Sequence, residues 1–257
     1  MRSKTISGFT LIEMSIVLLI IGLIIGTILV AEEMIEAAYL RSTVAQIEKF
    51  DAAAATFRLK YSGLPGDLST AGSFGFAATN QAKTMGRGDD NGLIESTLGC
   101  DGCLVNGEPY LFWTHLAQAG LIPSMPNEVT DYNYYNVAPI PGFTPSAAIG
   151  KGNIFFAASY QRKNYFTIGA INNGFGTPTI TPVEAYQIDS KLDDGEPDTG
   201  KVISIGTSNP TPSYAGVLGG GAAGTTACYN TSTTPPTYSI TASPQTGQCF
   251  LSIRTNF

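Results

Sequence analysis

Residues 8–31 read GFTLIEMSIVLLIIGLIIGTILVA, and this segment decides how the rest of the chain must be arranged. Residues 9–31 are almost wholly apolar, and they are long enough to cross a bilayer as one helix. Arg2 and Lys4 precede the segment, whereas the charged residues that closely follow it are all acidic: Glu32, Glu33 and Glu36. Because Lys and Arg stay on the cytoplasmic side of a membrane, we expect the N-terminus to be cytoplasmic.

The leader before this segment, MRSKTISG, is short and basic. An ordinary secretory signal has an apolar core of roughly 7–15 residues followed by a small-residue cleavage site, and the run here is longer. A short basic leader, a Gly, the FTLIE start and a long apolar run together resemble the signal of type IV prepilins. The resemblance implies that residues 1–8 are a leader peptide. A membrane-bound prepilin peptidase would cut between Gly8 and Phe9 and methylate the new N-terminal residue.

The first helix is expected to continue beyond the membrane. No Gly or Pro lies between Ala31 and Gly63, so we expect one helix over residues 9–61, ended by Gly63 and Pro65. In its outer half apolar residues recur at mostly three- and four-residue steps: Ile35, Ala38, Val44, Ile47, Ala54 and Phe57. Such a stripe predicts that this half packs against a globular domain formed by residues 62–257.

The globular part contains short elements between Gly- and Pro-rich loops. Thr181 and Glu184 form a capping-box pattern that begins a helix ending near Leu192. The other expected elements are a helix over 108–120, a hairpin of strands over 153–160 and 165–171, and a strand over 201–206. The predicted fold is therefore α+β, with a long N-terminal helix packed on an antiparallel sheet that carries long loops.

Composition favours an exported protein. The formal net charge is −6, and removing Arg2 and Lys4 with the leader gives −6 − 2 = −8, so nucleic acid is not an expected partner. Only 13% of the residues are charged, which suits a loop-rich exported domain. Four cysteines in such a chain indicate two disulfides, with three possible connectivities. Because many pilins carry a disulfide near the C-terminus, we predict Cys228–Cys249. We also predict Cys100–Cys103, so that each disulfide closes a local loop.

Two features of the apolar run concern assembly. Glu13 is its single ionisable residue, and a carboxylate at the bilayer centre costs about 2.5–3.5 kcal/mol, so a functional role is expected. The pilin resemblance implies that Glu13 pairs with the N-terminal amine of a neighbouring subunit. Gly22 and Gly26 form a GxxxG pair, which either supports close helix packing or reflects the frequency of Gly in membrane helices.

Catalysis has little support. His115 is the only histidine, so any Ser-His-Asp or Cys-His arrangement must use it, and its place on a predicted helix favours a packing role. Cys100 and Cys103 form a CxxC pair without the strand–helix pattern of a redox domain. We therefore predict that the protein is not an enzyme.

Two acidic loops are candidates for Ca²⁺. RGDDNGLIE, residues 87–95, has Arg87 where a calcium-binding EF-hand loop has its first ligand, and we interpret it as a solvated turn. The second loop gathers five carboxylates: Asp189, Asp193, Asp194, Glu196 and Asp198. It is either a Ca²⁺ site or a hydrated acidic turn.

The expected function is that of a structural subunit of a type IV pilus-like filament built from copies of itself or related pilins. Before assembly it would lie in the bacterial inner membrane as a single-pass protein. After assembly it would belong to a periplasmic or cell-surface filament. Two alternatives remain: a pseudopilin of a type II secretion system acting as a periplasmic piston, and an exported enzyme or binding protein tethered by its N-terminus.

Overall fold

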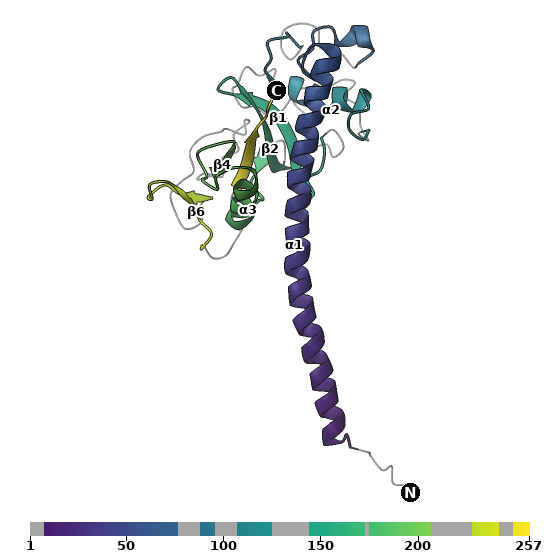
Figure 1. The fold of residues 1–257 in the computed structure, drawn as a ribbon, viewed down its shortest axis with the longest axis vertical. Coiled ribbons are helices and arrows are strands. Elements are labelled where there is room, and N and C mark those ends of the chain that lie inside the picture. The colour runs from purple at the N-terminus through teal and green to yellow at the C-terminus, as the bar shows by residue number, and fades with distance from the viewer. Residues whose placement is uncertain are drawn as a thin grey trace.

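The computed structural model describes residues 8–76, 88–95, 107–124, 144–172, 175–206, 228–241 and 249–257. Its main element is one long helix, α1 (Leu11–Tyr61), whose N-terminal half extends alone while its C-terminal half carries the domain (Figure 1). At 1.5 Å per residue its 51 residues span roughly 77 Å. The predicted α+β fold is confirmed.

The ends of α1 follow local capping chemistry. The helix begins at Leu11 because Thr10 caps it, two residues later than expected. It ends when Ser62 takes a left-handed conformation (φ 62°) and its backbone N–H donates to the Arg58 carbonyl at 2.9 Å. The helix therefore ends at Tyr61, as predicted, although Ser62 rather than Gly63 takes the left-handed position.

The main sheet has the strand order β1-β2-β7-β4, all antiparallel. Its strands are β1 (Ile154–Tyr160), β2 (Lys163–Asn172), β7 (Cys249–Arg254) and β4 (Val202–Gly206), and β3 (Phe175–Thr177) pairs with β2. The predicted hairpin is present. Tyr160 pairs with Lys163, so the chain turns through Gln161 and Arg162, whose φ angles of 47° and 61° are those of a type I′ turn.

Smaller elements surround this sheet. They are the 3₁₀ helix η1 (Ala71–Phe74), the α-helices α2 (Glu108–Gln118) and α3 (Pro182–Leu192), and the hairpin of β5 (Tyr229–Asn230) and β6 (Thr237–Tyr238). The capping box at the start of α3 is as predicted, because the Thr181 side chain accepts from the Glu184 N–H at 3.2 Å. α2 begins with Glu108 and Pro109, and it ends two residues before the predicted limit.

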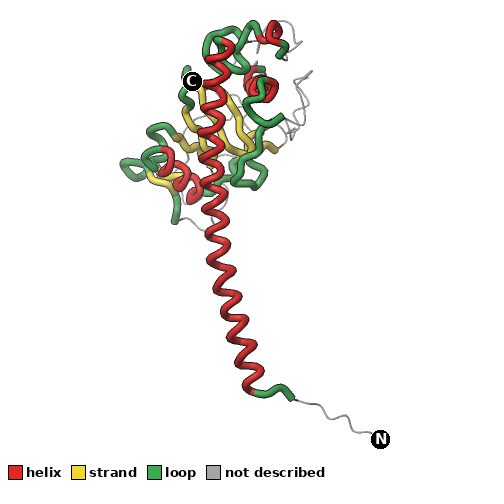
Figure 2. Tube along the Cα trace, turned by 45° about the vertical axis from the view of Figure 1, so that its right-hand side comes forward, coloured by secondary structure: helices red, strands yellow, loops and turns green. Residues whose placement is uncertain are grey.

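The core lies between the C-terminal half of α1, α2 and one face of the sheet (Figure 2). Phe50 of α1 is at its centre, with its ring edge-on to Trp113 of α2 at 5.0 Å and to Phe155 of β1 at 5.1 Å. Among the side chains of α1 that the structure describes, the first buried one is Leu40. Ile35 and Ala38, which were expected on the packed stripe, are exposed. Ile35 lies before the packed part of the helix, and Ala38 lies about 200° around the helix from the buried Leu40.

Candidate functional site

The start of α1 is organised by Thr10 and Glu13. The Thr10 hydroxyl accepts from the Glu13 N–H at 3.3 Å, while Glu13 Oε2 accepts from the Thr10 N–H and from its hydroxyl, each at 2.7 Å. This reciprocal arrangement is a capping box, which satisfies backbone donors that the first helical turn leaves without partners. Glu13 therefore holds the helix start in its own chain, a role that was not predicted. The T-x-x-E pattern that identified Thr181 and Glu184 also occurs here and would have revealed it.

The capping box leaves part of the carboxylate available. Glu13 Oε1 accepts no hydrogen bond from any residue that the structure describes. Gly8 and Phe9 precede the helix in non-helical backbone, and Phe9 is 80% exposed. The predicted cleavage bond is thus accessible and lies within four residues of the free carboxylate oxygen.

The apolar run is long enough to span a membrane, and none of its most apolar 18-residue stretch is buried within the described structure. It is therefore not a core helix of this domain. A Cβ added at Gly22 or at Gly26 would meet nothing within 4 Å. Neither glycine is needed for packing inside the chain, which leaves both surfaces open to another helix.

The predicted disulfide between Cys228 and Cys249 is confirmed, with the two Cα atoms 5.0 Å apart. It joins the chain just before β5 to the start of the central strand β7. Cys100 and Cys103 lie outside the described residues, so their pairing stays a prediction.

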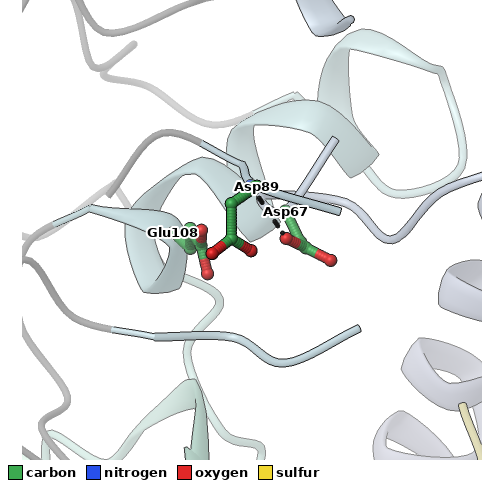
Figure 3. A group of neighbouring side chains, drawn as sticks. All are labelled: Asp67, Asp89 and Glu108. Carbon is green, nitrogen blue, oxygen red and sulfur yellow. Dashed lines mark hydrogen bonds between the residues drawn. The ribbon is translucent and has the colours of Figure 1, made fainter. Parts of the chain in front are cut away.

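A cluster of three carboxylates lies beside the first turn of α2 (Figure 3). Asp67 comes from the turn after α1, Asp89 from the loop over residues 88–95, and Glu108 from α2. One oxygen of each lies within 4.8 Å of the others. Asp67 accepts from the backbone N–H groups of Asp89 at 3.2 Å and Gly92 at 2.8 Å, which fastens the two loops together.

Burial changes the ionisation of this cluster. Asp67 and Glu108 are buried, while Asp89 is exposed. Loss of solvation raises the pKa of Glu108 to about 9 and that of Asp67 to about 6. Glu108 is therefore protonated at neutral pH, although its Oε2 accepts from the Glu95 N–H at 2.7 Å. Three carboxylates at this spacing have the donor chemistry that Ca²⁺ prefers.

Sequence reasoning missed this cluster because its members are far apart in the chain. Residues 88–95 were interpreted as a solvated turn, and the side chains of Asp89 and Asp90 are indeed exposed. Arg87 lies outside the described residues. The unexpected feature is Asp67, whose buried carboxylate holds the backbone of this loop.

In the second acidic loop, the carboxylates accept hydrogen bonds from backbone N–H groups and hydroxyls of the protein. Asp189, Asp193 and Asp194 come within 4.8 Å of one another, a group that does not include Glu196 or Asp198 among the described residues. Burial raises the pKa of Asp189 to about 6, and its Oδ2 accepts from the Tyr238 hydroxyl at 2.6 Å. The other carboxylates accept hydrogen bonds within residues 194–202: Asp193 from the Lys201 and Val202 N–H groups, and Asp194 from the Glu196 N–H and the Thr199 hydroxyl. The Ca²⁺ site stays a prediction.

His115 has a packing role. It is buried in α2, its Nδ1 accepts from the Gly66 N–H at 2.9 Å, and its ring stacks on Phe76 with the centroids 5.5 Å apart. This bond helps to attach the turn after α1 to α2. A histidine whose Nδ1 accepts a backbone N–H cannot use that nitrogen as a general base.

No protein-family model, characterised protein or solved structure matches this chain.

Proposed function

We propose that this chain is the structural subunit of a type IV pilus-like filament. It is made as a prepilin in the bacterial inner membrane, cut by a prepilin peptidase after Gly8, N-methylated at Phe9, and assembled through α1. The observation that carries this proposal is the division of α1 into two halves. One half is packed in the domain, and the other is apolar, exposed and begins with a single carboxylate.

The exposed half of α1 requires a partner. Large aliphatic side chains such as Leu11, Leu18, Leu19 and Leu23 are each more than two-thirds exposed. An apolar surface of this extent marks a membrane or protein interface. Lipid covers it before assembly, and in a filament the helices of neighbouring copies replace the lipid.

The start of the helix suits processing and assembly. Residues 8–10 are non-helical, so a peptidase can reach the bond after Gly8 without unwinding α1. After cleavage the new amine belongs to Phe9, and we propose that it pairs with Glu13 of a neighbouring copy. Such a pair replaces two separately buried charges by one neutral contact, which favours assembly in hydrocarbon.

Glu13 variants test this step. Glu13→Val removes both the charge and the capping box, whereas Glu13→Gln keeps an oxygen that can accept from Thr10 and removes only the charge. We expect both variants to insert and to be processed, and both to assemble poorly, because each leaves the amine without its counter-charge. Normal filament yield from Glu13→Gln would show that Glu13 acts only as a helix cap.

Electron microscopy of sheared surface material, with identification of the filament protein, tests the function itself. Long filaments of this chain in the sheared fraction are expected. Short fibres retained in the periplasm would identify a secretion pseudopilin. Monomer alone in the membrane fraction would favour a tethered binding protein or enzyme.

A further inference from the structure

A groove of about 430 Å³ lies where α1 leaves the domain. Its α1 wall consists of Glu32, Ile35, Glu36, Tyr39 and Leu40, and its domain wall consists of Ile149, Lys151 and Glu184. Ile35 and Tyr39 are 53% and 52% exposed, so the groove presents apolar surface to its surroundings. It begins directly after the apolar membrane segment and is continuous with it along the helix.

The groove carries excess negative charge. Three carboxylates and one amine line it, which gives −3 + 1 = −2. Lys151 forms an ion pair with Glu184, with its Nζ 2.6 Å from Glu184 Oε1. Glu32 and Glu36 form no ion pair with any residue in the described ranges. An occupant that fits this groove therefore supplies a cation together with a narrow, weakly polar surface.

The opposite face of α1 offers both properties. Arg41 lies nine residues after Glu32, which is two and a half helical turns, so the two side chains point to opposite sides of the helix. Ala38 and Ala45 flank Arg41 at the three- and four-residue steps that share a face. All three are exposed, and Arg41 has no ion pair among the described residues. The small side chains permit another backbone to approach closely.

We propose that the Arg41 face of one copy docks in the groove of the next copy, with Arg41 between Glu32 and Glu36. This inference rests on the proposed filament function and deepens it by naming the two surfaces that meet. Because they lie on opposite sides of one helix, the contact is head-to-tail and leaves a free groove and a free Arg41 face at the two ends. Repetition of such a contact builds an open helical filament rather than a closed dimer.

The offset between the two helices follows from the pairing. Arg41 lies five residues after Glu36 and nine residues after Glu32. If it sits between these two glutamates of the neighbouring copy, the two helices are displaced along their axis by roughly 7–14 Å, at 1.5 Å per residue. At an offset of six residues, or about 9 Å, which lies within that interval, Tyr39 of one copy is level with Ala45 of the next. These two positions are therefore the sharpest probes of the contact.

Charge reversal in the full-length chain is the first test. Arg41→Glu and the double variant Glu32→Lys with Glu36→Lys should each reduce filament yield at least tenfold, and their combination in one chain should restore it. Lys49→Glu, which reverses another exposed cation on α1, is the matched control and should assemble normally. Cleavage after Gly8 in every variant verifies membrane insertion. Unchanged yield from Arg41→Glu, or no restoration by the combined variant, would overturn the proposal.

Cysteine cross-linking separates this inference from the function on which it rests. Chains with Tyr39→Cys and with Ala45→Cys are co-expressed, and filaments are oxidised before peptide mapping. A disulfide between the two different variants is expected, and Ala45→Cys alone should give none above the unmodified chain. Filaments at normal yield without the mixed disulfide would reject the groove contact and leave the filament function intact. Absence of filaments from the unmodified chain would reject both.

Discussion

Glu108→Gln should make the protein more stable, by an amount that grows with pH. The Glu108 side chain is buried, and its pKa is raised from 4.5 to about 9, chiefly because burial removes solvent from the charged form. Between those two pH values the native state binds a proton that the unfolded chain has released. Stability contributed by the protonated carboxyl is therefore complete below pH 4.5 and is lost as the pH rises towards 9.

The magnitude follows from this linkage. One pH unit corresponds to about 1.4 kcal/mol for a single proton, so three units between pH 5 and pH 8 give at most roughly 4 kcal/mol. Glu108→Gln is neutral in both states and keeps a carbonyl oxygen that can accept from the Glu95 N–H. The difference in free energy of unfolding between this variant and the unmodified chain should therefore increase by up to this amount from pH 5 to pH 8. Asp67, whose pKa is raised to about 6, makes the free energy of unfolding of both proteins fall further as the pH rises towards 6.

Urea unfolding of the full chain in detergent measures the effect, with EGTA present so that no cation neutralises the carboxylates. Trp113 is the only tryptophan, lies buried in the same helix as Glu108, and reports unfolding by its fluorescence. Glu48→Gln, a change at an exposed glutamate of α1, is the control and should follow the unmodified chain. Parallel pH dependences for Glu108→Gln and the unmodified chain would show that Glu108 is not held neutral.

Three further predictions concern processing, the disulfide and calcium. Gly8→Leu should block cleavage, so immunoblots should show only the precursor; a processed band from this variant would place the cut elsewhere. Cys228→Ser with Cys249→Ser should lower the free energy of unfolding by roughly 3 kcal/mol, from the chain entropy of a 21-residue separation. A loss below about 1 kcal/mol on urea unfolding would contradict that estimate. If Asp189, Asp193 and Asp194 bind Ca²⁺, calcium should raise the melting temperature and Asp193→Asn with Asp194→Asn should abolish the rise. An EGTA-insensitive melting temperature would leave the loop a turn closed by its own donors.

The elements predicted correctly from the sequence are those specified by nearby residues. The length of α1 follows from an uninterrupted helical stretch, α3 from its capping box, and the hairpin of β1 and β2 from two apolar runs joined by a short polar turn. Each signal lies within a few residues of the structure that it specifies.

The features that were missed depend on segments far apart in the chain. β7 is the last strand in the sequence and yet lies between β2 and β4, a position that only the pairing of distant segments determines. The cluster at Glu108 joins three segments of the chain. The pKa of Glu108 is raised by burial, which the residues around it in the sequence do not predict. The groove beside Ile35 exists because the domain ends near Leu40, and the apolar stripe of α1 does not mark that limit.

The mass of the N-terminal peptide in purified filaments shows whether this chain is a processed filament subunit. We expect filaments whose subunit begins at Phe9 and carries one N-methyl group, because the accessible bond after Gly8 is cut before α1 enters the assembly. Filaments made of chains that still begin at Met1, or a cleaved chain that is recovered only as monomer, would contradict it.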